Sequence, residues 1–271
     1  MQNIAWSYYE YTPQRESIAS HVKKSQNCKM HVRYSSRQHR VASISVVIPA
    51  QNEATCLPIL LQRLREMPLV EEVIVADGGS HDSTLQVARD CGASIVEGTR
   101  GRGPQQNLAA RSASGDILWF LHADALPARG CTQQIEKAFR GGAIGGNFRL
   151  RFAARGIWPR IFEIIARSQR PFGVYYGDSG IWVTRAAWEK LGGFEAWPLF
   201  EDLDFARRLE KLARSDKKKT ACCPGRLRVS ARRFARSPAR VLWLWARLQI
   251  AFELGAPPEE LARLYHGPGK S

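Results

Sequence analysis

The sequence lacks the features that mark several large classes of protein. Its six cysteines form no CxxC pair and no metal-ligand spacing, so we expect reduced thiols rather than disulfides or zinc ligands. The N-terminus has no signal-peptide pattern, and the longest apolar run, residues 241–246, is closed by Arg247, far short of a membrane span. These absences predict a cytoplasmic protein, or one that is peripheral on the inner face of the membrane.

Acidic residues are few for a chain of this size. Only 25 Asp and Glu stand against 40 Lys and Arg, and the formal net charge is +15. Such an excess indicates an anionic partner, which can be a phosphate-bearing ligand, an acidic membrane surface or nucleic acid. No recognised nucleic-acid-binding module is present, so nucleic acid is not the expected partner. The 271 residues, 44% of them hydrophobic, suffice for a large folded domain.

Composition and pattern divide the chain into three parts. Residues 1–42 are rich in Ser, Lys, Arg and His without any period, and they are predicted to form a basic, mobile N-terminal extension. Residues 43–235 carry the strand and helix patterns of the main domain. Residues 236–271 are predicted to be a C-terminal helical segment, because residues 238–254 are apolar around most of a helix circumference.

Strand and helix patterns alternate through residues 43–121. The strand patterns are "SISVVIPAQNE", "EEVIVADGGS", "ASIVEG" and "ILWFL", and a helical pattern separates each from the next. This alternation predicts an α/β fold with a doubly wound, mostly parallel sheet and helices on both faces. Beyond residue 128 the alternation loosens. There we expect a mixed sheet, with a hairpin or edge strand at "TACCPGRLRVSA".

Polar residues follow each strand of this first half, at the edge where ligands collect in parallel sheets. They are Glu53, Asp77, Arg100, Arg102 and Asp124. A helix N-cap or a turn is the structural alternative for any one of them, and Asp124 alone fits a turn cap equally well, but Asp77 comes before Gly78 and Gly79 and is too early to cap the next helix. Together they predict a nucleotide-diphosphate site, in which acids read a base or ribose, arginines hold phosphates and an acid holds a divalent cation.

Several stretches, in this order, resemble the inverting family 2 glycosyltransferases of the GT-A fold: "SVVIPAQNE", "VIVADGGSHDST", "GRGPQQN", "FLHADALP" and "LGGF" followed by "FEDLDFARRL". The resemblance covers about residues 43–265. "YGDSGIWV" and "SARRF" are similar to a bacterial subgroup linked to arsenosugar biosynthesis and carotenoid-ester glycosylation. The resemblance implies transfer of a sugar, with inversion, from a nucleotide-sugar donor to a hydroxyl acceptor that is a lipid or a small molecule.

The resemblance also implies roles on the donor side. A divalent cation, Mn²⁺ or Mg²⁺, is the implied cofactor, and Asp124 takes the place of the last residue of the metal-binding DxD motif. The first aspartate of that motif is His122 here, which could bind the metal, hydrogen-bond the diphosphate or pack structurally. The residues implied to bind the donor nucleotide are Pro49, Glu53, Asp77, Arg100, Arg102 and Asn107.

On the acceptor side, Asp202 takes the place of the general base that deprotonates the acceptor hydroxyl. Glu201 and Asp204 are rival bases, because three acids open an otherwise basic helix. Other residues are candidates for contacts with the acceptor or the diphosphate, and a turn, a loop or a solvated basic edge is the structural alternative for them. These residues are Asp178, Gly193, Arg232 and Arg233.

Two other functions compete with this interpretation. The charge and the lysine run at residues 217–219 favour a protein that binds nucleic acid or another phosphate-rich ligand. A sugar nucleotidyltransferase shares the α/β core, but it needs a Gly- and Arg-rich loop directly after the first strand, where this chain reads "AQNEAT". The dinucleotide fingerprint and the P-loop follow none of the predicted strands.

The C-terminal helix suggests one more partner. Trp243, Trp245 and Phe252 are aromatic residues of the kind found at membrane interfaces, and Arg240 and Arg247 stand beside them. This pattern predicts peripheral contact with an anionic membrane surface. Packing of the helix against the main domain is the alternative.

Overall fold

The computed structural model describes residues 41–98, 101–231 and 237–266. These residues form one eight-stranded sheet in the order β3-β2-β1-β4-β7-β6-β8-β5. The predicted N-terminal extension lies almost entirely outside the described residues, as do Arg100, Arg232 and Arg233. The strands are β1 (Ile44–Ala50), β2 (Val70–Asp77), β3 (Ser94–Glu97), β4 (Ile117–Phe120), β5 (Leu126–Pro127), β6 (Ala143–Phe152), β7 (Trp182–Thr184) and β8 (Lys219–Val229).

The first half of the sheet is parallel, as its alternating pattern predicts. Strand β1 pairs in parallel with β2 on one side and β4 on the other, and β2 pairs in parallel with β3. Short β7 then runs antiparallel between β4 and β6, and β6 pairs in parallel with β8. The predicted mixed second half is therefore confirmed. Strand β8 is a single strand of 11 residues rather than a hairpin, and β5 pairs with it antiparallel.

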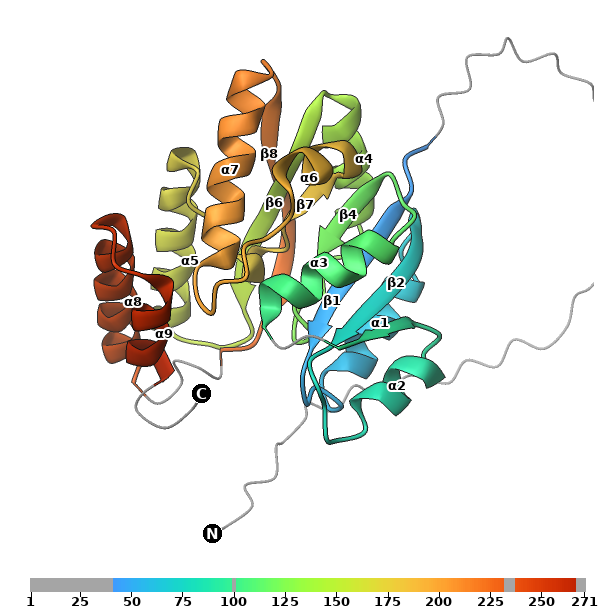
Figure 1. Cartoon of the computed structure of the whole chain (residues 1–271), viewed down its shortest axis with the longest axis horizontal. Helices are drawn as coiled ribbons and strands as arrows, with labels where there is room; N and C mark the ends of the chain where they lie inside the picture. The colour runs from blue at the N-terminus through green and yellow to red at the C-terminus, as the bar shows by residue number, and fades with distance from the viewer. Residues whose placement is uncertain (1–40, 99–100, 232–236, 267–271) are drawn as a thin grey trace, which may run out of the picture. The chain divides into compact units, whose positions relative to one another are not determined.

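Helices cover both faces of the sheet, which confirms the predicted α/β class (Figure 1). Two short 3₁₀ turns, η1 (Arg170–Phe172) and η2 (Gly177–Ser179), link α5 to β7. The helices are α1 (Leu57–Arg65), α2 (Thr84–Asp90), α3 (Arg102–Ser112), α4 (Cys131–Arg140), α5 (Ile157–Gln169), α6 (Arg185–Leu191), α7 (Glu201–Ser215), α8 (Pro238–Glu253) and α9 (Pro258–His266).

The core has two layers because successive strand residues point to opposite faces. In β1, Val46 and Ile48 pack in the layer beneath α1, α2, α4 and α5, whereas Val47 packs with α3, α6 and α7. Trp119 and Phe120 of β4 divide in the same way. The strand ends that carry the predicted donor residues are thus fixed from both sides.

The C-terminal helices pack against the rest of the fold. Leu248 of α8 and Leu261 of α9 share a buried cluster with Leu203 of α7, and Figure 1 shows α8 and α9 beside α5. Helix α9 lies within the predicted C-terminal helical segment, and Pro258 and two acids in its first turn are typical of a helix start. No described helix is both long and apolar enough to cross a membrane.

Candidate active site

The loops after β1 and β2 are joined by hydrogen bonds into one structure. The Asn52 backbone N–H donates to Ser80 Oγ at 2.9 Å, and Asn52 Oδ1 accepts from the His81 backbone at 2.8 Å. One residue later, the Glu53 N–H donates to Thr84 Oγ1 at 2.8 Å. Glu53 is therefore held by its backbone at the carboxyl ends of two neighbouring strands.

Asp77 ends β2 and is 4% exposed. Its carboxylate accepts hydrogen bonds from the backbone N–H groups of Gly79 and Ser80, both at 2.9 Å, and from Ser80 Oγ at 2.5 Å. The carboxylate thus organises the turn after β2, while α2 begins only at Thr84, so Asp77 is a turn residue and not a helix N-cap. Its predicted contact with a nucleotide adds to that role and does not replace it.

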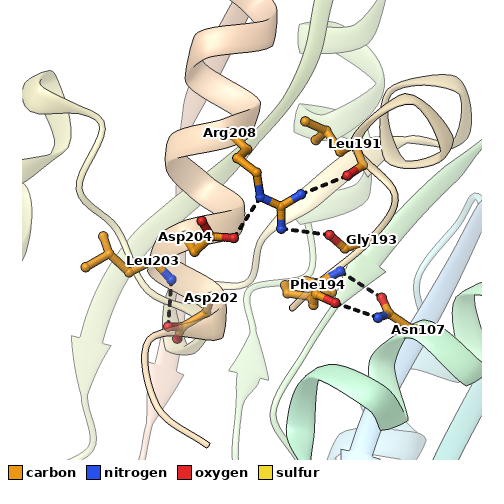
Figure 2. Close-up of polar contacts among 8 residues, drawn as sticks. All are labelled: Asn107, Leu191, Gly193, Phe194, Asp202, Leu203, Asp204 and Arg208. Carbon is orange, nitrogen blue, oxygen red and sulfur yellow. Dashed lines mark hydrogen bonds and ion pairs between the residues drawn. The ribbon is translucent and has the colours of Figure 1, made fainter. Parts of the chain in front are cut away.

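Helix α3 is locked to the loop that precedes α7. Asn107 Nδ2 donates to the Phe194 carbonyl at 2.7 Å, and Asn107 Oδ1 accepts from the Phe194 N–H at 2.8 Å (Figure 2). A Cβ on Gly193 would lie 2.3 Å from Asn107 Oδ1, and one on Gly103 would lie 2.2 Å from the Glu195 carbonyl oxygen. The two glycines therefore permit a close approach of backbones, and Asn107 ties the donor side to the predicted acceptor loop.

Asp204 belongs to a second brace on the same loop. It accepts from Arg208 Nε at 2.7 Å, and the Arg208 guanidinium donates to the carbonyls of Leu191 and Gly193, each at 2.8 Å (Figure 2). Asp204 thus faces Arg208, while Asp202 points to the other side of the helix. This geometry weakens the case for Asp204 as a base and gives it a positioning role.

The first turn of α7 carries two buried acids, as the sequence predicts for Asp202. Asp202 is 8% exposed and Glu201 is 2% exposed. Asp202 Oδ2 accepts from the Gly177 N–H at 2.7 Å, and Asp202 Oδ1 accepts from the Leu203 N–H at 2.8 Å. These two bonds fix the orientation of the carboxylate at the start of the helix.

Gly177 brings His122 next to Asp202. A Cβ on Gly177 would lie 3.0 Å from His122 Nε2 and 3.2 Å from Asp202 Oδ2, so only glycine fits between them without displacing one. The loop after β4 and the start of α7 meet at this point. Gly177 belongs to the stretch "YGDSGIWV", in which no sequence signal marks it as a site residue.

Arg102 is the first residue of α3, and its side chain reaches the start of α7. Its Nη1 lies 3.2 Å from Glu201 Oε1, and the Glu201 side chain is 3% exposed. Burial, reinforced by the charge of Asp202, raises the pKa of Glu201 to about 7, although Arg102 opposes the shift. Burial lowers the pKa of Arg102, but the charges of Glu201 and Asp202 outweigh it and the net shift is upward. The predicted donor arginine is therefore also a partner of the predicted acids.

A cavity of about 1150 Å³ brings together predicted residues of the acceptor side and two of the donor side, Arg102 and His122. Its lining does not include Pro49, Glu53, Asp77 or Asp124, which belong to the strand ends on the donor side. Asn107 and Gly193 lie in the brace between the two regions. The predicted residues that line the cavity are Arg102, His122, Asp178, Glu201 and Asp202.

A metal ion at the loop after β4 would need ligands from outside the protein. His122 and Asp124 are separated by one residue, and the Ala125 N–H donates to the His122 carbonyl at 3.0 Å in a tight turn. Over the described ranges, no cluster of three or more His, Cys, Asp or Glu side chains is placed to hold a metal. A Mg²⁺-type ion is commonly held by one or two carboxylates plus substrate phosphates and water, so this sparse donor set fits an ion carried on a diphosphate.

The parallel strand ends, the acids of α7 and the cavity between them define the GT-A class of transferase. The model of the family described as glycosyl transferase family 2 matches residues 45–191. The chain therefore belongs to glycosyl transferase family 2.

Relatives and solved structures agree with this assignment. The chain is 39% identical over 90 residues to a 4,4'-diaponeurosporenoate glycosyltransferase of Staphylococcus haemolyticus, which covers 30% of this chain and 24% of that protein. It is 31% identical over 153 residues to an undecaprenyl-phosphate 4-deoxy-4-formamido-L-arabinose transferase of Aeromonas hydrophila, which covers 51% of this chain and 46% of that protein. The chain thus spans less than half the length of these two relatives.

The fold matches a mannosyltransferase of Pyrobaculum calidifontis, solved with GDP-Man and Mn²⁺, at a TM-score of 0.58 and 22% identity over 83% of this chain and 68% of that one. It also matches glucosyl-3-phosphoglycerate synthase of Mycobacterium tuberculosis, solved with Mn²⁺, UDP and glucosyl-3-phosphoglycerate. There the TM-score is 0.57 and the sequence identity 20%, over 80% of each chain.

Proposed function

We propose that this protein transfers a sugar from a nucleotide-diphosphate donor to an acceptor hydroxyl with inversion, and that Asp202 is the general base. The observation that carries the proposal is the placement of Asp202. This buried carboxylate lines the cavity, accepts hydrogen bonds from two backbone amides, and opens the helix next to the strand-end loops. Membership of glycosyl transferase family 2 supports the reaction class.

The donor occupies the strand-end side. Pro49, Glu53 and Asp77 line the nucleoside pocket in this proposal, because they lie on β1, its following loop and the end of β2. Arg100 and Arg102 flank the diphosphate. Arg102 already has a carboxylate partner in Glu201, so a bound diphosphate shares or takes over that guanidinium.

Asp124 holds a divalent cation, Mn²⁺ or Mg²⁺, against the diphosphate oxygens, with His122 as a second ligand or as a hydrogen-bond donor to the diphosphate. When bound, such a cation offsets the negative charge of the departing nucleotide. The two solved structures that share the fold and contain Mn²⁺ support this part of the proposal.

The acceptor hydroxyl approaches from the cavity side. Asp202 takes its proton as the oxygen attacks the anomeric carbon, and the nucleotide diphosphate leaves from the opposite face, which inverts the configuration. Glu201 is the rival base because its pKa of about 7 suits proton transfer. Its bond to Arg102 favours a positioning role, in which it keeps the donor arginine beside the base.

The finer assignments rest on resemblance. We propose that the protein belongs to the subgroup linked to arsenosugar biosynthesis and carotenoid-ester glycosylation, and the match to a diaponeurosporenoate glycosyltransferase supports the second of these. We also propose a cytoplasmic location with peripheral contact at an anionic membrane. Trp243 is 61% exposed and supports that contact, whereas Trp245 packs against the core.

The test is a panel of thermal unfolding measurements with UDP, GDP and other nucleotide diphosphates, with and without Mn²⁺ or Mg²⁺. A nucleotide present at about 100 times its Kd stabilises the protein by roughly 2.7 kcal/mol. We expect one nucleotide to stabilise the protein more strongly with the metal than without it. Asp124→Asn should abolish the metal-dependent part and leave the metal-independent part. A protein that no nucleotide stabilises would refute the proposed function.

A further inference from the structure

The cavity that Asp202 lines extends well beyond the reacting groups. Its volume of about 1150 Å³ is above the roughly 300–1,000 Å³ that is common for small-molecule sites. Away from Asp202 its walls come from the second half of β6, from α5 and from α8. The cavity therefore has more room than a single hydroxyl-bearing ring requires.

These distant walls are largely apolar. Phe148 of β6, Phe162 of α5 and Leu248 of α8 line the cavity and are 1%, 3% and 2% exposed. The rings of Phe162 and Trp245 meet edge to face, with centroids 5.5 Å apart, and so join α5 to α8. Gln249 Oε1, which accepts from Gln169 Nε2 at 3.1 Å and from the Tyr176 hydroxyl at 3.0 Å, fastens α8 further. An apolar wall supported in this way suits a hydrocarbon.

The cavity opens where exposed apolar side chains gather. Ile164 of α5 and Ile250 of α8 both line it and are 66% and 60% exposed. Of the nine large apolar side chains that are exposed in the described part of the chain, seven lie on α5, α9, the turn after α5, or α8 and the residue after it. Exposed apolar residues on neighbouring elements are typical of a contact surface, and Ile164 and Ile250 make part of this surface continuous with the cavity, at what we call its mouth.

Arginines add a charge to this mouth. Four exposed arginines belong to the cavity lining. Their long stems can lie along apolar surface while the guanidinium groups reach an anionic headgroup. A site for a fully water-soluble acceptor would be expected to have polar residues where this cavity has an apolar wall. The four are Arg149, Arg160, Arg167 and Arg226.

We propose that this cavity binds the hydrocarbon chain of a lipid alcohol drawn from an anionic bilayer, with the hydroxyl of the lipid presented to Asp202. The assignment rests on the proposed function, because it names the acceptor of that reaction. The hydroxyl proton passes to the Asp202 carboxylate, the oxygen forms a bond to the anomeric carbon, and the bond from that carbon to the nucleotide diphosphate breaks. The products are a glycosylated lipid and the free nucleotide diphosphate.

Photolabelling of the full chain tests the proposal. Dodecanol with a terminal diazirine is irradiated with the protein, and the labelled peptides are mapped by mass spectrometry. We expect labels in β6, α5 and α8. Unlabelled dodecanol should compete at a concentration at least about a hundredfold lower than butanol, because each additional buried methylene strengthens binding about fourfold. Equal competition by butanol, or labels confined to other segments, would overturn the proposal.

Matched variants separate the cavity from general surface adsorption. The double change Ile164→Glu with Ile250→Glu charges the mouth at exposed positions, and Ile59→Glu adds the same charge on α1, where Ile59 is 50% exposed. We expect at least a fivefold loss of labelling in the double variant and none in Ile59→Glu. Equal labelling of the two would overturn the proposal.

Nucleotide binding is measured on the same samples. Stabilisation by UDP or GDP with Mn²⁺ should be unchanged in the mouth variants. If a nucleotide binds but the cavity is not labelled, the lipid inference fails alone and the proposed function stands. If the cavity is labelled but no nucleotide stabilises the protein, the proposed function fails, and the role of the cavity as an acceptor site fails with it.

Discussion

Replacement of Asp202 by asparagine separates the chemical role of this residue from its structural role. The amide cannot accept the acceptor proton at neutral pH, so we expect transfer to fall by about 10²–10⁴-fold if Asp202 is the general base. Nucleotide affinity should change little, because the donor residues lie on other loops. The assay is single-turnover transfer at saturating donor, with nucleotide affinity measured beside it.

The structure adds a stability cost to this substitution. Both carboxylate oxygens of Asp202 accept backbone hydrogen bonds, from Gly177 at 2.7 Å and from Leu203 at 2.8 Å. An amide has one oxygen, so its NH₂ group must face one of the two N–H donors. Loss of one buried hydrogen bond of this kind costs about 1–3 kcal/mol. Relief of the repulsion between Asp202 and Glu201 offsets part of that cost.

This loss appears as a fall in Tm of about 2–4 °C per kcal/mol for a protein of this size. Asp216→Asn is the control, since Asp216 ends the same helix and pairs at the surface with Lys190. It should leave transfer and nucleotide affinity near wild type. Asp204→Asn is not a neutral control, because Asp204 holds Arg208 in the brace on the Gly193 loop. Near-wild-type turnover in Asp202→Asn, or a larger loss in Glu201→Gln, would refute Asp202 as the base.

Two further predictions follow from the same region. Burial raises the pKa of Glu201 from 4.5 to about 7, so the folded state keeps a proton that the unfolded state releases. The free energy of unfolding should therefore fall by roughly 3 kcal/mol as pH rises from about 4.5 to 7. Urea unfolding across this pH range should show a flatter profile for Glu201→Gln than for the wild type, and identical profiles would contradict the assignment of this pH dependence to Glu201. Gly193→Ala should destabilise by about 1–3 kcal/mol, because the residue has a φ of +83° and the new Cβ would meet Asn107 at 2.3 Å. Gly192→Ala is the control, because Gly192 has a φ of +76° and its added Cβ would have no atom within 4 Å, so only backbone strain remains. It should lower Tm less than Gly193→Ala does. An equal fall in Tm would show that the contact with Asn107 contributes nothing.

The sequence predicts the parallel half of the sheet well because its signals are local. Each strand there is a short apolar run closed by turn residues, and the helices carry local signals such as the leucine spacing of α1, Gly92 after α2 and Pro104 near the start of α3. Helix α6 and β5 are absent from the sequence prediction, and β5, with two residues, is too short to show a period. The mixed half is less regular in pattern, which is why β8 was predicted as a hairpin or an edge strand.

The site is only partly readable from sequence for a related reason. The order of motifs places Asp202 at the start of a helix, and the structure confirms that position. Its partner Gly177 lies 25 residues earlier, Glu201 pairs with Arg102 across 99 residues, and Asn107 bonds to Phe194 across 87. No local pattern encodes such pairs. Asp77 is the opposite case, since its bonds to Gly79 and Ser80 are local and of the kind that a turn sequence indicates.

The brace between α3 and the Gly193 loop has a consequence for how such a chain can diversify. Asn107 and the tight contacts at Gly103 and Gly193 link the donor side directly to the loop before α7. A substitution that reshapes the nucleotide pocket through α3 would therefore also displace the loop before the base helix. The walls on α5 and α8 are contributed by later segments of the chain and carry none of these contacts. Under the proposed function, exchanging those walls would change the acceptor while donor choice is inherited intact, as long as Leu248 of α8 keeps its packing against Leu203 of α7.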